Sequence, residues 1–229
     1  MLLSISDEWR DTAVLYSAIT TPAKLTTLIE QLCDKAANGE SPEASRQVLI
    51  LAYDCWLENT RALPEATRTR IQALCYGELE KCMQAGEWNE ADDYTYRLMG
   101  QVLGKRYGEY FSSDEMLTFP CADLLRIDGL WVKHSQGRFG FSVQKEIYVR
   151  CGGVLDGKYA EKPYVQFFQA VGWCKEGSKQ YDTAKEIIEA DAIRNYTDYI
   201  FSPEKAVEGH LPERRKWFFP ISLLSHPYL

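Results

Sequence analysis

The sequence predicts an all-α chain, in which an N-terminal helical bundle precedes a second, mainly helical domain. Apolar residues recur at the three- and four-residue spacing of a buried helix face along most of the 229 residues. Alternation of apolar and polar residues, which marks a strand, is clear only at Phe139–Val143 and is too short to seed a sheet. The apolar fraction of 45% and the charged fraction of 26% are those of a globular protein that buries a core.

Residues 1 to about 83 are expected to form four helices with short connections, as in a small bundle. Pro22 stands near the start of one helix, Asn38-Gly39 near its end, and Pro64 before the fourth helix. A helical repeat protein remains the alternative, although no self-similar period is found. The apolar stripes are Trp9, Ala13, Tyr16 and Ile19; Leu25, Leu28, Ile29, Leu32, Cys33 and Ala36; Val48, Leu51, Ala52, Cys55 and Trp56; and Ile71, Leu74, Cys75, Leu79 and Cys82.

The segment Gln84–Glu87 is the predicted seam, which gives domains at residues 1–84 and 85–229. Aromatic residues become dense after the seam, so we expect residues 85–229 to hold a complete core and to fold alone. Gly104–Ser113 and Asn195–Pro203 are interpreted as aromatic loops, and Thr183–Glu186 as a capping box that starts a helix. The helix stripes are Trp88, Ala91, Thr95, Leu98, Met99 and Val102; Leu124, Ile127 and Trp131; Tyr164, Phe167, Phe168 and Val171; and Ile187 with Ile188.

The segment Trp131–Gln144 carries the most specific local pattern. A helix that contains Trp131 runs into a turn punctuated by glycines. Gly137 is predicted to stop the helix in the left-handed conformation, and Gly140 to allow close approach of the backbone between two aromatic residues. Trp131, Phe139, Phe141 and Trp173 are expected to pack in the core.

Charge and motif content exclude several classes of function. A net charge of −7 argues against a nucleic-acid-binding protein, because binding to the phosphate backbone favours dense Lys and Arg. No apolar run approaches the roughly 20 residues that span a bilayer, and the N-terminus lacks the basic region of a signal peptide. Neither a nucleophile elbow, nor a phosphate-binding glycine loop, nor a metal-ligand pair occurs, so an enzyme is not expected.

The seven cysteines predict small buried side chains in a reducing compartment. Their number is odd, no Cys-x-x-Cys motif occurs, and the three histidines lack ligand spacing, so no metal site is expected. Asp92 and Asp123 lie near helix starts, where a carboxylate caps the helix or complements its dipole.

Six short motifs follow one another in a fixed order. They are Ala91-Asp-Asp-Tyr-Thr95; Phe119-Pro-Cys-Ala-Asp-Leu124 with Ile127-Asp-Gly-Leu-Trp131; the segment through Gln144; Gly172-Trp173; Gly209-His-Leu-Pro212; and Ser225-His-Pro227. In this order they resemble the genomes-uncoupled-four family, whose domain binds porphyrins and assists magnesium chelatase. The resemblance runs from near Gly86 to near Pro227, and a helical bundle before the domain is similar to that of the cyanobacterial members.

The resemblance implies a domain shaped like a cupped hand, with a helical core and two long loops that hold a flat tetrapyrrole. It places the first loop at about Gly104–Met116 and the second between Trp173 and Gly209. The second loop departs from the family pattern, since no Trp-x-Arg-Trp-Pro-like run follows Gly172-Trp173. A longer segment stands there instead, and a short extra loop occurs at Gly152–Gly157.

The resemblance also implies the ligand and the partner. The ligand is protoporphyrin IX or its magnesium complex, with no covalent cofactor, and the partner is the large, porphyrin-binding subunit of magnesium chelatase. The chain itself is expected to be non-enzymatic, in a cyanobacterium-like cytoplasm or the plastid stroma, with peripheral membrane contact left open. The expected ligand-binding residues are Leu98, Met99, Tyr107, Tyr110, Phe111, Tyr181, Tyr196, Tyr199, Phe201, Arg214 and Arg215.

The departures in the second loop leave alternatives open. In one alternative, the chain is a divergent member of the family that binds another tetrapyrrole, such as a bilin. In the other, it is an adaptor that acts only through contacts with other proteins. Cys121 and Cys174 are the thiols that a bilin would react with. His134 is a minor alternative as a metal ligand, although its expected role is to end a helix favourably.

Overall fold

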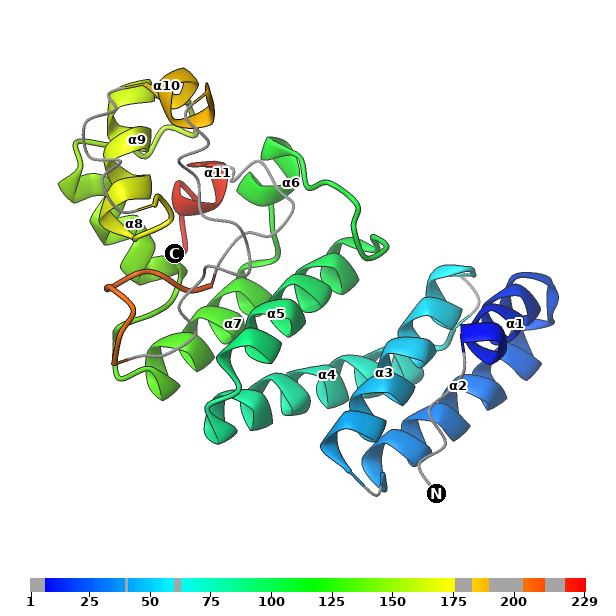
Figure 1. Cartoon of the computed structure of the whole chain (residues 1–229). Coiled ribbons are helices and arrows are strands. Elements are labelled where there is room, and N and C mark those ends of the chain that lie inside the picture. Colours follow the sequence, from blue (N-terminus) through cyan, green and yellow to red (C-terminus); the bar gives the residue numbers. More distant parts are fainter. Residues whose placement is uncertain (1–6, 40, 60–62, 176–182, 190–203, 213–220) are drawn as a thin grey trace. The chain divides into compact units, whose positions relative to one another are not determined.

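The computed structural model describes residues 7–39, 41–59, 63–175, 183–189, 204–212 and 221–229 (Figure 1). All regular elements in these ranges are helices, and no strand occurs among them, so the all-α prediction is confirmed. The helices are α1 (Asp7–Ile19), α2 (Pro22–Ala37), α3 (Pro42–Leu57), α4 (Glu65–Ala85), α5 (Trp88–Leu103), α6 (Ser113–Leu117), α7 (Cys121–His134), α8 (Phe141–Arg150), α9 (Glu161–Ala170), α10 (Ala184–Glu189) and α11 (Ile221–Leu224).

The chain divides into two compact units. Unit 1 consists of Met1–Lys81 and Tyr96–Glu109, and unit 2 consists of Cys82–Thr95 and Tyr110–Leu229. Helix α5 therefore begins in unit 2 and ends in unit 1. The predicted domain boundary between residues 84 and 85 stays a prediction, because it describes independent folding rather than compactness.

Unit 1 is built on α3, against which both α1 and α2 pack. Within the predicted stripe of α2, Leu25, Ile29 and Cys33 are fully enclosed and Ala36 is buried, whereas Leu28 and Leu32 are half-buried. Helices α2 and α3 start with Pro22 and Pro42, in the first turn, where the missing N–H is not needed. Arg70 of α4 adds ion pairs to Glu30 and Asp34 of α2, which lie one helical turn apart.

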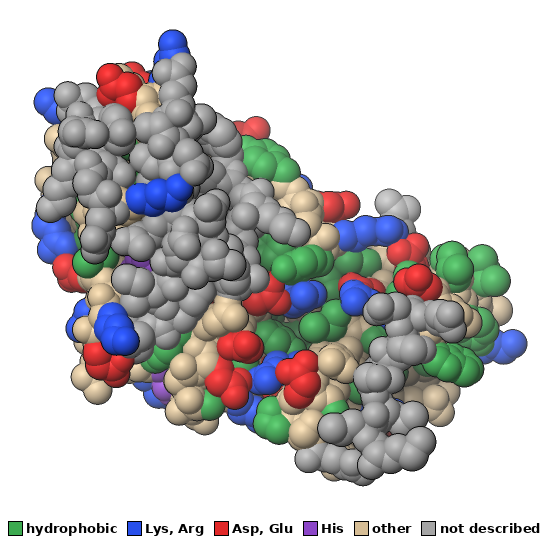
Figure 2. All heavy atoms as spheres, viewed as in Figure 1, with side chains coloured by type: hydrophobic (Ala, Val, Ile, Leu, Met, Phe, Trp, Pro, Cys, Tyr) green, Lys and Arg blue, Asp and Glu red, His purple; other side chains and the backbone are tan. Residues whose placement is uncertain are grey.

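Helix α1 forms where the sequence predicts it, but its apolar stripe faces outward. Trp9 is 72% exposed and Ile19 is 86% exposed, and hydrophobic side chains reach the surface at the α1 end of unit 1 (Figure 2). The inward face is carried instead by Ser17, which is fully buried and donates its hydroxyl proton to the C=O of Val14 at 2.6 Å. The helical spacing thus predicted the element and not its orientation.

In the described part of unit 2, buried aromatic side chains gather in two places. One forms where α5 and α7 present Trp88 and Trp131 to each other. The other lies on α8 and α9, where Tyr148, Phe167 and Phe168 pack with Trp173. The terminal helix α11 packs on α6 and α8, and it closes this part of the unit.

A fragment of residues 85–229 would test the predicted boundary. We expect one cooperative unfolding transition, because both aromatic groups of unit 2 remain. The second half of α5 should fray, since the fragment lacks Cys75, whose sulfur accepts a hydrogen bond from Gln101 at 3.1 Å. Hydrogen exchange at Leu98–Leu103 should therefore be at least about tenfold faster than in the full chain, while exchange in the first half of α5 stays slow. An aggregated fragment would show that α1–α4 supply part of the core.

Candidate ligand-binding site

The indole of Trp131 is completely buried and joins α7 to α5. Its N–H donates to the hydroxyl of Thr95 at 2.9 Å, and that hydroxyl donates to the C=O of Ala91 at 2.9 Å. The rings of Trp88 and Phe139 lie 5.9 and 6.4 Å from the ring of Trp131. This buried hydrogen bond joins the Ala91–Thr95 motif to the Ile127–Trp131 motif. It also explains why a threonine, Thr95, stands on the apolar face of α5.

Helix α7 ends in a turn with two consecutive left-handed residues, Gln136 at φ 57° and Gly137 at φ 79°. The N–H of Gly137 donates to the C=O of Val132 at 2.8 Å, which is the bond of a Schellman motif. The N–H of Phe139 then donates to the hydroxyl of Ser135 at 2.8 Å. The left-handed residue that ends the helix in this motif is Gln136, one position before the predicted Gly137, and Gly137 is left-handed as well.

Gly140 caps the start of α8 with φ 134° and ψ 161°, a conformation that is essentially restricted to glycine. A Cβ atom there would lie 2.8 Å from Oδ1 of Asp128. The same oxygen accepts the N–H of Ser142 at 2.9 Å, so a buried carboxylate of α7 satisfies the first turn of α8. The strand-like alternation at Phe139–Val143 is therefore split by a helix start.

The side-chain amide of Gln144 holds the Gly209–Pro212 segment. This side chain is fully buried in α8, and its Nε2 donates to the C=O of Gly209 at 3.0 Å and to that of Pro212 at 2.8 Å. Two backbone bonds add to it, from Gly140 N–H to the C=O of Leu211 at 3.0 Å and from Gly209 N–H to the C=O of Arg138 at 2.8 Å. Sequence reasoning missed this role of Gln144; the signal was an amide on the otherwise apolar face of α8.

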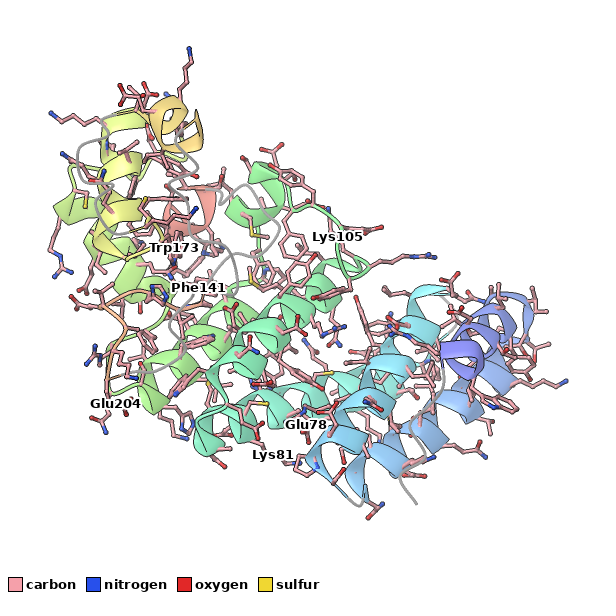
Figure 3. The ribbon with its side chains drawn as sticks, in the orientation of Figure 1. Glu78, Lys81, Lys105, Phe141, Trp173 and Glu204 are labelled. Atoms are coloured by element: carbon pink, nitrogen blue, oxygen red, sulfur yellow. The ribbon has the colours of Figure 1, made fainter. Side chains whose placement is uncertain are left out.

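Trp173 ties the two ends of the second predicted loop together. It is 1% exposed, and its indole N–H donates to the C=O of His210 at 2.8 Å (Figure 3). Nδ1 of His210 lies 2.7 Å from the C=O of Val171. The chain just before this loop and the chain just after it are therefore held side by side by buried polar contacts.

The closing motif is also anchored. Nε2 of His226 lies 2.9 Å from the C=O of Phe119, although 107 residues separate them. The hydroxyl of Ser225 accepts the N–H of Gly157 at 3.0 Å, which fixes the end of the short extra loop. Across the described residues the six motifs thus build the scaffold, and Trp131, Phe139, Phe141 and Trp173 lie in the core as predicted.

The first predicted loop begins with a rigid turn in unit 1. Gly104, at φ 67°, ends α5, and the N–H of Lys105 donates back to the C=O of Gly100 at 2.8 Å. The hydroxyl of Tyr96 accepts the N–H of Gly108 at 2.7 Å. The Arg97 guanidinium lies 3.9 Å from the centre of the Tyr107 ring, which is a cation–π contact. Tyr107 itself is 39% exposed.

The remainder of this loop lies in unit 2. Tyr110 is 53% exposed, whereas Phe111 and Met116 are buried. The hydroxyl of Ser112 accepts the N–H of Glu115, and the Glu115 carboxylate accepts the N–H of Ser112 at 2.7 Å, so a capping box starts α6.

The predicted ligand-binding residues fall into three groups. The first group is buried: Leu98, Met99 and Phe111 are at most 4% exposed. The second group, Tyr107 and Tyr110, is exposed. Tyr181, Tyr196, Tyr199, Phe201, Arg214 and Arg215 lie outside the described residues. Tyr107 and Tyr110 are thus exposed on the first loop, and all of the expected ligand-binding residues stay predictions.

Unit 1 also carries two hollows. One, of about 10 Å³, lies at the base of the first loop beside Tyr53, Tyr96 and Arg97, and has room for about one water molecule. The other is an open groove of about 500 Å³ beside α1 and α3. Ion pairs of Arg10 with Asp54 and of Arg106 with Glu58 line this groove, together with Val14, Leu57 and Tyr107.

Cys33, Cys55, Cys75, Cys82 and Cys174 are buried as predicted, whereas Cys151 is half-buried and Cys121 is exposed. Burial raises the pKa of the Cys33 and Cys55 thiols to about 11 and that of Cys75 to about 12, so all three are unreactive near neutral pH. Of the two thiols considered for a bilin, Cys121 is exposed at the first turn of α7 and Cys174 is buried.

His134 lies in the last turn of α7, where a basic side chain is favourable.

Two further properties concern the part of the chain that the structure describes. No cluster of three or more His, Cys, Asp and Glu side chains there is arranged to hold a metal ion. No helix there combines the length and apolarity that a bilayer crossing requires.

The comparisons with known proteins converge on one family. The model of the GUN4-like family matches residues 69–227. The chain is 36% identical over 107 residues to the chloroplastic tetrapyrrole-binding protein of Arabidopsis thaliana, which is 45% of this chain and 36% of that protein. It is 30% identical over 106 residues to a Ycf53-like protein of Synechocystis, covering 44% of this chain and 41% of that one.

A longer match joins the chain to the ycf53 protein of Porphyra purpurea, at 30% identity over 165 residues, or 70% of this chain and 61% of that protein. The chain thus spans between about a third and three fifths of the length of these relatives. Among solved structures, the ligand-free GUN4 of Arabidopsis thaliana aligns with a TM-score of 0.50 and 26% identity, covering 67% of this chain and 93% of that chain.

Proposed function

The chain belongs to the GUN4-like family, and on that premise we propose that it binds a tetrapyrrole and regulates magnesium chelatase without catalysing a reaction. The observation that carries the proposal is the match of the family model to residues 69–227, together with the relative in Arabidopsis that is named a tetrapyrrole-binding protein. Relatives in a chloroplast and in a cyanobacterium support a location in the plastid stroma or the cyanobacterial cytoplasm.

The chemistry of the ligand agrees with the residues that the chain offers. A porphyrin is a large apolar disc with propionates at one edge, so it needs aromatic or aliphatic faces and a cation near the edge. Exposed Tyr107 and Tyr110 supply aromatic surface on the first loop. Arg214 and Arg215, just after the anchored Pro212, are the proposed partners of the propionates.

The regulatory role follows from the same ligand. Protoporphyrin IX is the substrate of magnesium chelatase and its magnesium complex is the product. A protein that binds either one raises chelatase output by delivering the substrate or by removing the product. We place the contact with the large, porphyrin-binding subunit of the enzyme.

A bilin-binding sensor is the second candidate. One specific observation favours it: no Trp occurs between Trp173 and Trp217, where the porphyrin-binding pattern has a Trp-x-Arg-Trp-Pro-like run. Cys121 is the exposed thiol that a bound bilin could reach.

Parallel titrations test the proposal. Tryptophan fluorescence of the full chain is followed as protoporphyrin IX and biliverdin are added separately, with N-acetyltryptophanamide as the control for absorption of light by the ligand. We expect saturable quenching by protoporphyrin IX and faster magnesium insertion when the chain is added to magnesium chelatase. Saturation by biliverdin alone would favour the sensor, and saturation by neither would leave an adaptor that acts through protein contacts.

A further inference from the structure

Tyr53 of α3 reaches across to the start of the first loop. The side chain is 4% exposed, and its hydroxyl donates to the C=O of Lys105 at 2.6 Å. Lys105 follows the glycine that ends α5 and stands at the end of that helix (Figure 3). Burial raises the pKa of Tyr53 far above its usual value, so the phenol stays a neutral donor at physiological pH.

Glu58, at the C-terminal end of α3, holds the next residue of the loop. Its carboxylate lies 2.6 Å from the guanidinium of Arg106, and its side chain is only 19% exposed. The backbone of Arg106 is fixed in addition by Glu109, whose carboxylate accepts the Arg106 N–H at 3.0 Å and whose own N–H donates to the Arg106 C=O at 3.1 Å. Two consecutive loop residues are thus held by two residues of one bundle helix.

Tyr107 comes directly after these anchored residues. Its ring is stacked under Arg97 at 3.9 Å and meets the edge of the Tyr96 ring at 5.0 Å between centres. The contacts from α3 and those from α5 together determine where this exposed ring stands. A binding loop that is already ordered loses less conformational entropy when the ligand arrives.

We propose that Tyr53 and Glu58 are positioning residues: through Lys105 and Arg106 they pre-order the first loop and thereby raise its affinity for a tetrapyrrole that neither of them contacts. This inference rests on the proposed function of the same loop. It gives the N-terminal bundle a role in ligand binding, although Tyr53 and Glu58 precede the residues 69–227 that the family model matches.

The first experiment compares Tyr53→Phe with Tyr16→Phe, an exposed position on α1 that serves as the matched control. Both are titrated with protoporphyrin IX. We expect Tyr53→Phe to bind about three- to tenfold more weakly, as for one net hydrogen bond, and Tyr16→Phe to bind like the wild type. Trypsin should also cut after Lys105 about fivefold faster in Tyr53→Phe, because the carbonyl at that bond has lost its donor.

The second experiment is a charge swap. Glu58→Arg and Arg106→Glu should each weaken binding of protoporphyrin IX by about three- to tenfold, and the double variant should restore most of the loss. The matched control is the swap of Glu43 and Arg46, an ion pair within α3 that is remote in sequence from the loop. Restoration in the double variant shows that the pair between positions 58 and 106, and not either residue alone, carries the effect.

The outcomes are distinct. Equal porphyrin affinity of the wild type, Tyr53→Phe and the single charge variants would overturn the inference while leaving the proposed function intact. If the wild type shows no saturable binding, the proposed function fails, and unchanged trypsin cleavage after Lys105 would then remove the positioning role as well.

Discussion

Replacing Arg214 and Arg215 together by Ala is expected to weaken the binding of protoporphyrin IX by about 10- to 150-fold. A charge-assisted hydrogen bond contributes about 1.5–3 kcal/mol, and every 1.4 kcal/mol is a factor of about ten in affinity. The affinity for the dimethyl ester of the same porphyrin, which carries no carboxylate, should change by less than about threefold. Fluorescence titrations with the acid and the ester measure both values.

Lys216→Ala is the matched control, since it removes a neighbouring charge of the same run and should affect the acid by less than about threefold. Equal losses for the acid and the ester would remove the propionate contact from the proposal. A loss for Lys216→Ala as large as for the arginines would indicate general electrostatic attraction instead of a specific contact.

Gly140→Ala is expected to lower the free energy of unfolding by about 2–4 kcal/mol. The backbone at φ 134° and ψ 161° costs a side-chain-bearing residue about 1–3 kcal/mol. The new Cβ atom would also lie 2.8 Å from Oδ1 of Asp128, so the bond from Ser142 N–H to that oxygen must lengthen, at a further cost of about 1 kcal/mol. Thermal unfolding followed by circular dichroism should show a midpoint lower by roughly 5–15 °C.

Gly129→Ala provides the control one residue after Asp128. Gly129 lies inside α7 with no atom near its missing Cβ, so alanine there should stabilise the chain by about 0.5–1 kcal/mol. If Gly140→Ala melts at the temperature of the wild type, the close approach at Gly140 is not maintained in solution.

Most of the helices could be predicted from the sequence because they carry a local signal, whereas α6, α8 and α11 were not expected. In α2, Leu25, Ile29, Cys33 and Ala36 of the predicted stripe are buried, and α7 is stopped by the left-handed Gln136, one residue before the glycine predicted to stop it. Helical spacing shows that one face is apolar without showing what covers it, which is why Trp9 and Ile19 of α1 turned out to be exposed.

The contacts that shape the candidate site were not predictable in the same way. Tyr53 and Lys105 are 52 residues apart, and no local sequence pattern at either residue predicts the hydrogen bond between them. Gln144 binds two carbonyl groups that lie 65 and 68 residues further along the chain. Local propensity contains no information about such pairings, because they depend on how helices pack after they form. The residues of the second loop rest on the family resemblance alone.

The bond from Trp173 to His210 has a consequence for how this protein can change. It joins residues 37 positions apart, so the second loop starts and ends at a fixed point of the scaffold. For a closed loop, doubling the number of residues adds only about 0.6 kcal/mol of entropic cost. The length and the sequence of this loop can therefore change during evolution while the contacts of Trp173 and Gln144 with the Gly209–Pro212 segment are kept. The part of the loop that packs on the scaffold limits such changes, because Ile187 of α10 is 3% exposed and belongs to the same buried cluster as Phe167 and Phe168.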